Sequence, residues 1–315
     1  MAVYDCFTFF NELDLLDVRL NILDEYVDKF VLVEMPCTFQ GKKKNLIFKE
    51  NRERFRKYLD KIIYVCPSEF PMYNGDGDFG IEYFQRNSIL EALTFCNPED
   101  IVIISDIDEI PNPMVFKEKI ALSYNRDSYS FKRNIKTLLY ELSFGRKSLV
   151  KKIITRNKTY LHEWLDVTPV SLEQELFYYF MNCRSKGKWY GPVICKYKNM
   201  NMPQRLRDNR ELLPFIEKAG WHFSYLGGIK KIKEKLASIV DSDPNIVKTL
   251  RKYSKDDEYI RKCILSGKDI LGRSGKNFEY EFINDKELGI GNLKEIKNMH
   301  PYFFLNPSLE ESKGE

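Results

Sequence analysis

The stretch IVIISDIDEIP, residues 101–111, decides the fold class because it joins an apolar run to a cluster of carboxylates. Residues 101–104 are all β-branched, as expected of a strand that is covered on both faces of a parallel sheet. Asp106, Asp108 and Glu109 follow directly. Carboxylates this close together repel one another at neutral pH, so the stretch predicts a positive partner among them.

The chain before this stretch alternates between strand-like and helix-like patterns. Apolar runs predict strands over residues 3–10, 30–34 and 62–66. Apolar residues at spacings of three and four predict helices over residues 13–27 and 81–95. This alternation indicates an α/β domain with a mostly parallel central sheet between helices. Ligands of such sheets bind beyond the carboxyl ends of the strands, where the acidic cluster lies.

Length and composition exclude several classes of protein. The chain has 315 residues, of which 43% are hydrophobic, enough for one large domain and an extension. A net charge of +4 gives no case for nucleic-acid binding. No run predicts a transmembrane helix, and no signal-peptide pattern precedes the first strand. The seven cysteines form no C-x-x-C pair, so we expect reduced thiols and a cytoplasmic protein.

The second half of the chain is less regular. Residues 128–144 suggest one or two strands, and KWYGP, residues 188–192, carries a turn signal. A helix is predicted from Ile229 through Val240, and the last part of the chain is mostly helical. We therefore expect a catalytic domain over residues 1–228 and a helical extension over residues 229–315, packed on it.

The D-x-D spacing of Asp106 and Asp108 predicts a metal site. Side chains two residues apart on a strand point the same way. Two carboxylates on one side can hold Mn²⁺ or Mg²⁺, which proteins bind with few carboxylates and the phosphates of a substrate. The pattern therefore predicts a site for a metal ion and a diphosphate.

The acidic cluster has three other interpretations: an EF-hand loop, a phosphohydrolase site and helix capping. An EF-hand loop is excluded because Pro111 occupies the position that requires glycine. A D-x-D phosphohydrolase would use Asp106 as its nucleophile, but its motif normally follows the first strand of a domain. Helix capping explains residues 112–113 but leaves Asp106 without a role.

Four blocks in order support the metal interpretation: residues 4–34, EYFQRNSILEAL (82–93), ISDIDEIP (104–111) and AGWHFSYLGG (219–228). Together they resemble glycosyltransferase family seventeen, over residues 4 to about 273. The resemblance implies a GT-A-type, Rossmann-like nucleotide-sugar transferase fold, a divalent metal and the donor UDP-GlcNAc. It also implies a glycan acceptor, a β-1,4 linkage and inversion at the anomeric carbon.

The resemblance also implies roles for individual residues. Asp108 would contact the metal directly, and Asp106 would reach the ribose or, through water, the metal. Glu109 would support the site or act in catalysis. His222 looks like the late histidine that many GT-A enzymes supply as a metal ligand, although a lone histidine among aromatic residues is often a core residue.

Three further residues are candidates for binding the nucleotide. Glu34 and Glu12 follow the first two strands, where GT-A folds often bind uracil and ribose; Glu12 could equally be a first-turn helix acid. Arg86 could bind the diphosphate or pair with Asp106 or Asp108. Its alternative is an ordinary helix pair with Glu82.

Several other motifs have a structural explanation that is simpler than a functional one. The basic residues 42–44 are most simply a solvated loop. GDGDFG, residues 75–80, follows no strand and carries two aspartates where phosphate would sit, so it is not a dinucleotide fingerprint. It predicts a mobile loop that could act as a lid. Most aromatic residues belong in the core, and only one or two of the following could stack on sugars: Trp164, Trp189, Tyr190 and Trp221. The general base is not identified, and its candidates are Glu109, Glu163, Asp241 and Asp243.

These observations favour a metal-dependent, inverting transfer of N-acetylglucosamine from UDP-GlcNAc to a sugar hydroxyl. Two alternatives stay open: a phosphohydrolase, and a non-catalytic protein that binds a nucleotide sugar or a glycan. Lysines flank the apolar face of the helix from Ile229, so a peripheral contact with membrane-bound acceptors is an alternative to the packed helix that we favour.

Overall fold

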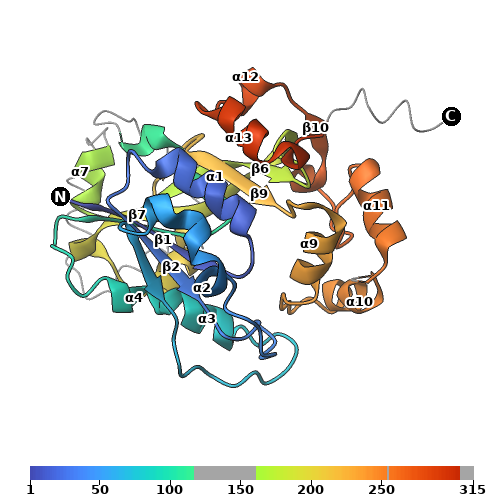
Figure 1. Cartoon of the computed structure of the whole chain (residues 1–315), viewed down its shortest axis with the longest axis horizontal. Coiled ribbons are helices and arrows are strands. Elements are labelled where there is room, and N and C mark those ends of the chain that lie inside the picture. Colours follow the sequence, from blue (N-terminus) through green and yellow to red (C-terminus); the bar gives the residue numbers. More distant parts are fainter. Residues whose placement is uncertain (117–160, 254, 306–315) are drawn as a thin grey trace, which may run out of the picture.

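The computed structural model of the protein describes residues 1–116, 161–253 and 255–305. The strands expected within residues 128–144 lie outside these described residues. Figure 1 shows one curved sheet with helices packed on it and a group of further helices at one end.

The first four strands form the parallel part of the sheet, in the order β3-β2-β1-β4. They are β1 (Val3–Phe9), β2 (Lys29–Glu34), β3 (Ile62–Val65) and β4 (Ile101–Asp106). The helices that connect them are α1 (Leu13–Leu23), α2 (Ile47–Asn51), α3 (Gly80–Asn87) and α4 (Ile89–Ala92). The strands expected from the sequence are therefore confirmed. The helix expected over residues 81–95 is divided at Ser88, and the charged segment after α2 is the 3₁₀ helix η1 (Arg52–Tyr58).

Alternate residues of β1 pack on opposite faces of the sheet, as the period of a strand requires. Phe7 and Phe9 share one hydrophobic cluster with Leu16 of α1. Cys6 belongs to a second cluster with Ile89 of α4. Both faces of the parallel strands are thus covered, which explains their continuous apolar runs.

The rest of the sheet is mixed and continues from β4 in the order β7-β6-β9-β5. Its strands are β5 (Glu109–Pro111), β6 (Val170–Tyr178), β7 (Cys183–Lys196), β8 (Phe215–Ile216) and β9 (Gly220–Ser224). β7 is antiparallel to both β4 and β6, whereas β9 is parallel to β6. Two short helices flank this part, α7 (Leu161–Leu165) and α8 (Pro203–Asp208).

The turn signal in KWYGP was misleading, because these residues lie inside β7. The pairing of β6 with β7 shifts register between Ser171 and Glu173, opposite Gly191 and Pro192. A proline lacks the N–H that a ladder needs and is tolerated at a bulge. The Gly-Pro pair therefore marks a bulge in a long strand rather than a reversal of the chain.

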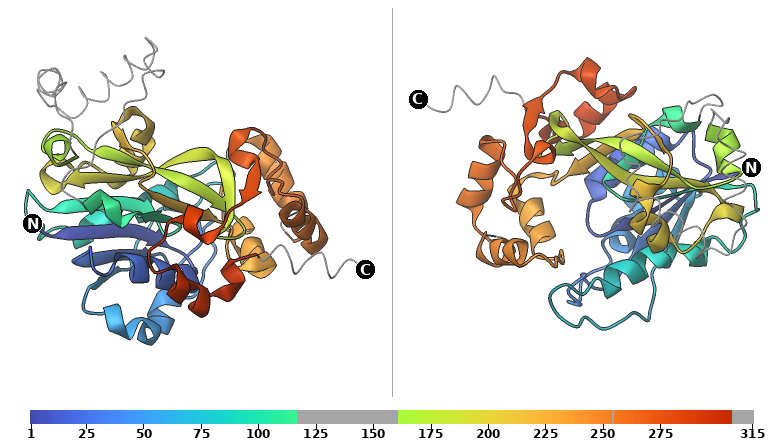
Figure 2. Two further views of the ribbon diagram at one scale, coloured as in Figure 1. Left: turned by 90° about the horizontal axis from the view of Figure 1, so that it is seen from above. Right: turned by 180° about the vertical axis from the view of Figure 1, so that it is seen from behind.

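The chain after residue 228 is mostly helical, as expected. Its helices are α9 (Gly228–Leu236), α10 (Pro244–Tyr253), α11 (Asp257–Leu265), α12 (Asp285–Leu288) and α13 (Leu293–Met299). β10 (Tyr280–Phe282) interrupts them and adds an antiparallel strand to β7. The helix expected through Val240 ends earlier, at Leu236. Both views in Figure 2 show α9–α11 together at the end of the sheet away from the N-terminus.

No helix in the described part of the chain is long and apolar enough to cross a membrane.

Candidate functional site

The acidic cluster forms a tight turn between β4 and β5, and a buried arginine of α1 holds its backbone. The Nη1 atom of Arg19 donates to the main-chain oxygens of Asp106, Ile107 and Glu109, at 2.9, 3.2 and 3.0 Å. The other side of the guanidinium binds the carboxylate of Asp5, at 2.7 and 2.6 Å. Arg19 and Asp5 are both fully buried. One paired guanidinium therefore fixes the turn that carries all three acids.

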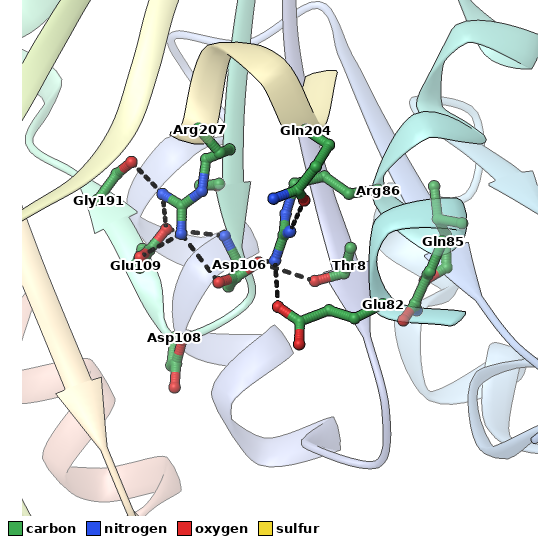
Figure 3. A network of polar contacts seen from close by, with 12 residues as sticks. Thr8, Glu82, Gln85, Arg86, Asp106, Asp108, Glu109, Gly191, Gln204 and Arg207 are labelled. Carbon is green, nitrogen blue, oxygen red and sulfur yellow. Dashed lines mark hydrogen bonds and ion pairs between the residues drawn. The ribbon is translucent and has the colours of Figure 1, made fainter. Parts of the chain in front are cut away.

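Two more arginines neutralise Asp106 and Glu109 (Figure 3). Arg86 of α3 and Arg207 of α8 lie 2.9 and 3.0 Å from the carboxylate of Asp106. Arg207 also lies 2.7 Å from Glu109, which is 1% exposed. Burial alone would raise the pKa of Asp106, but the charges of the two arginines outweigh it and hold this pKa well below its usual range. We call these four residues the arginine side of the turn.

The arginine side is closed by further hydrogen bonds. Thr8 donates to Asp106 at 3.1 Å, and Trp189 donates from its indole to Glu109 at 2.7 Å. A Cβ atom at Gly191 would lie 2.5 Å from both Glu109 and Trp189. Glycine is therefore required at this point of β7, where the strand approaches the acidic turn most closely.

Asp108 faces a different set of partners. Its Oδ2 atom lies 2.7 Å from the ammonium of Lys235 in α9 and 3.6 Å from Nε2 of His222 in β9. The charge of Lys235, with a contribution from the neighbouring His222, outweighs burial and lowers the pKa of Asp108, while Asp108 in turn raises the pKa of Lys235. Figure 3 shows Asp108 set apart from the two arginines. We call Asp108, His222 and Lys235 the lysine side of the turn.

The expectation that Asp106 and Asp108 point the same way is wrong in this structure. β4 ends at Asp106, so Asp108 lies in the turn and the two-residue period of a strand does not reach it. The two carboxylates consequently contact different cations.

His222 is placed by strand pairing. It lies opposite Glu109 in the antiparallel pair of β5 and β9. The N–H of the next residue, Phe223, donates to the main-chain oxygen of Asp108 at 2.8 Å. The ring of Trp189 lies 4.7 Å from the His222 ring. Among the described residues, the buried Nδ1 of His222 has no hydrogen-bond partner, and Nε2 is the ring nitrogen that faces Asp108.

Asp108 and His222 fit part of a divalent metal site. A carboxylate oxygen and an imidazole nitrogen suit Mn²⁺, and Mg²⁺ or Mn²⁺ often completes its coordination with substrate phosphates and water. Within the described residues, no group of three or more acids, histidines and cysteines could hold a metal ion. The two residues would therefore hold a metal only together with a ligand.

The predicted nucleotide residues have partners of their own. Glu34 is fully buried and accepts from Lys44 at 3.2 Å and Tyr64 at 2.9 Å. Glu12 accepts from the N–H groups of residues 10 and 11. Arg86 pairs with Asp106 and also with Glu82, so both expected pairings form. Their roles toward a nucleotide stay predictions.

The candidates for the general base lie in different places. Glu109 belongs to the arginine side. Glu163 lies on α7, at the end of the sheet away from α9 (Figure 1). Asp241 and Asp243 lie between α9 and α10, where each carboxylate accepts from a nearby main-chain N–H. Asp241 borders a cavity of about 630 Å³ between α10 and the loop at Gly77.

Sequence reasoning missed three residues of the site: Arg19, Arg207 and Lys235. Arg207 and Lys235 are separated from their partner aspartates by 101 and 127 positions, so no local pattern connects them. Arg19 gave a signal, because it lies between Val18 and Leu20 on the buried side of α1. A buried arginine requires an acid partner.

Comparison with known proteins supports the resemblance. Residues 1–148 match the model of glycosyltransferase family 17, which confirms the predicted resemblance for this segment. The human β-1,4-mannosyl-glycoprotein 4-β-N-acetylglucosaminyltransferase is 25% identical over 241 residues, which are 74% of this chain and 42% of the human protein. The rat enzyme of the same name is 26% identical over 82% of this chain and 46% of its own length. The chain thus spans less than half the length of these relatives.

Solved structures give only distant matches. A mannosyltransferase from Pyrobaculum calidifontis, in complex with GDP-Man and Mn²⁺, is 9% identical with a TM-score of 0.33, over 96% of this chain and 72% of its own. A glucosyl-3-phosphoglycerate synthase from M. tuberculosis is 14% identical with a TM-score of 0.26, over 87% of this chain and 82% of its own. The fold of this protein confirms the sequence-based expectation without these matches. Its strands form an α/β sheet, and the D-x-D motif begins at the end of β4.

Proposed function

We propose, from the match of residues 1–148 to glycosyltransferase family 17, that this protein transfers N-acetylglucosamine from UDP-GlcNAc to a sugar hydroxyl of a glycan. The observation that carries the proposal is the pair Asp108 and His222, which meet at the carboxyl end of β4. Nucleotide ligands of α/β sheets bind at this edge.

The two sides of the turn would have separate tasks. The arginine side fixes the turn, since Asp106 and Glu109 are paired with two buried arginines and Glu109 is itself buried. Asp108 and His222 would hold Mn²⁺ or Mg²⁺, and the bound metal would neutralise the negative charge that develops on the leaving diphosphate. Glu109 is 1% exposed and already bound by Arg207 and Trp189, which fits support of the turn better than proton transfer.

Inversion requires the acceptor hydroxyl to attack the anomeric carbon from the face opposite the diphosphate. The bond from this carbon to the diphosphate oxygen breaks and leaves its electron pair on the oxygen. A carboxylate base accepts the hydroxyl proton. Asp241 and Asp243 remain candidates for this base because they lie between α9 and α10, on the part of the chain that carries Lys235.

The phosphohydrolase alternative is not favoured. A nucleophilic Asp106 needs a free carboxylate oxygen, but one oxygen accepts from Thr8 and Arg86 and the other from Arg207. The same ion pairs that fix the turn would therefore have to break before Asp106 could attack a phosphate.

Release of the nucleotide from a panel of nucleotide sugars, with Mn²⁺ or with EDTA, tests the proposal. We expect slow release of UDP from UDP-GlcNAc that needs the metal, and faster release with a suitable glycan. Asp108→Asn should reduce the rate by about a hundredfold or more, because a metal contact made at the reacting diphosphate is lost.

The matched control is Asp257→Asn, which changes an aspartate that pairs with another lysine of α9, Lys233, at the surface. This variant should keep the wild-type rate. UDP binding without turnover on any acceptor would favour a binding protein, and release of phosphate from simple esters would favour the phosphohydrolase.

A further inference from the structure

Helix α9 directs two lysines toward the acidic turn. Lys231 and Lys235 are one helical turn apart, so they share a face of α9. Lys231 lies 3.2 Å from the main-chain oxygen of Asn11, at the end of β1, and Lys235 lies 2.7 Å from Asp108. Both line a cavity of about 40 Å³ together with Glu12 and Asp108.

The pair Lys235–Asp108 differs from the pair that only stabilises the fold. Arg19 and Asp5 are 0% exposed, and no ligand can reach them without unfolding. The side chain of Lys235 is 31% exposed to solvent, and that of Asp108 is 10% exposed. An ammonium on a flexible stem is also released more easily than a guanidinium held at several points. Lys235 is thus a positive charge that can exchange its partner.

The cavity beside these lysines is small. Its volume of about 40 Å³ has room for about one water molecule. Gly227 caps the helix with a φ of 93°, and a Cβ atom there would lie only 2.9 Å from Cγ of Lys231, so the helix begins close to this lysine. A diphosphate is larger than the cavity, so Lys235 would have to move away from Asp108 to admit it.

We propose that Lys235, assisted by Lys231, binds the diphosphate of the donor. Without donor, Lys235 neutralises Asp108. When the donor binds, the ammonium moves to the phosphate oxygens and Asp108 becomes free for a metal ion. Lys235 stays protonated throughout, so it stabilises the electron pair left on the diphosphate oxygen without transferring a proton. This inference rests on the proposed function and adds the residues that recognise the leaving group.

Calorimetric titrations in EDTA separate this role from a structural one. The probes are inorganic diphosphate, UDP and uridine. Lys235→Met should weaken the binding of UDP and of diphosphate by about ten- to a hundredfold, which corresponds to the loss of one hydrogen bond to a charged group. The affinity for uridine should not change. Lys235→Arg should recover part of the loss. Lys233→Met, on the same helix but paired with Asp257, should bind like the wild type.

A second variant tests the exchange of partners directly. Asp108→Asn removes the charge that holds Lys235 and repels phosphate, so it should bind diphosphate more tightly than the wild type in EDTA. If Lys235→Met does not fold, the double variant Asp108→Asn, Lys235→Met removes both charges together. It should bind diphosphate more weakly than Asp108→Asn alone.

Equal affinity of the wild type and Lys235→Met for diphosphate would overturn the inference, as would an equal loss for uridine. Either result leaves the proposed function intact if UDP-GlcNAc is still turned over. A wild-type protein that binds neither UDP nor diphosphate, even with Mn²⁺, would overturn both proposals.

Discussion

The arginine side and the lysine side of one turn are built differently, although their aspartates are only two residues apart. The two sides differ in the exposure of their cations: on the arginine side, Arg86 and Arg207 are both 4% exposed, whereas Asp106 is 30% exposed. On the lysine side, Lys235 is 31% exposed and borders a cavity. One D-x-D motif thus carries an aspartate held by two buried arginines and an aspartate held by a partly exposed lysine.

The chemistry of the cations explains the division. A guanidinium is planar and has five donors, so Arg207 can bind Asp106 and Glu109 together. An ammonium is a compact charge on a flexible stem, and Lys235 binds a single carboxylate oxygen. Arginines therefore suit the part of the turn that holds two acids together, and a lysine suits the part where we propose that a ligand binds.

The largest effect is expected on the arginine side. Arg207→Met would leave Asp106 and Glu109 without their shared cation, and loss of one partner of a buried ion pair typically costs about 3–5 kcal/mol. Urea unfolding should show this loss. Arg261→Met, at an exposed position of α11, is the control and should unfold like the wild type. Equal unfolding midpoints for Arg207→Met and the wild type would show that the arginine side does not anchor the turn.

A smaller, pH-dependent effect is expected on the lysine side. Because Lys235 lowers the pKa of Asp108, the stability from this pair is fully present above the usual aspartate pKa of about 3.9. It is lost as the pH falls toward the lower pKa of the folded protein. Lys235→Met should therefore differ most from the wild type in urea midpoint at pH 7, and less at pH 3. A difference that does not change with pH would contradict the pairing.

The first half of the fold could be predicted because each strand has a local signal. The apolar runs that end at Glu34 and Asp106 mark β2 and β4, and parallel pairing follows from the helices between them. The helical character of the chain after residue 228 could also be predicted, but the mixed part of the sheet could not. β7 pairs with β4 on one side and β6 on the other, and it contains a bulge at Gly191. In the sequence, a Gly-Pro pair in such a bulge cannot be distinguished from a Gly-Pro pair in a turn.

The site could be predicted only in part, for the same reason. The resemblance indicated Asp108 and His222, and the structure brings them to 3.6 Å. The cations that divide the turn into two sides come from α8 and α9, far along the chain. For Arg207 and Lys235 the sequence carries no local sign that they reach the acidic turn, whereas the expected pair of Arg86 with Asp106 does form.

Titration of UDP with Mn²⁺ and with EDTA, into the wild type and into Asp108→Asn, tests the division of the turn most directly. We predict that Mn²⁺ strengthens UDP binding to the wild type and gives no such gain to Asp108→Asn. The unfolding midpoint of each protein, measured alongside, confirms that both are folded. An equal gain from Mn²⁺ in both proteins would contradict the assignment of Asp108 to the exchangeable, ligand-facing side.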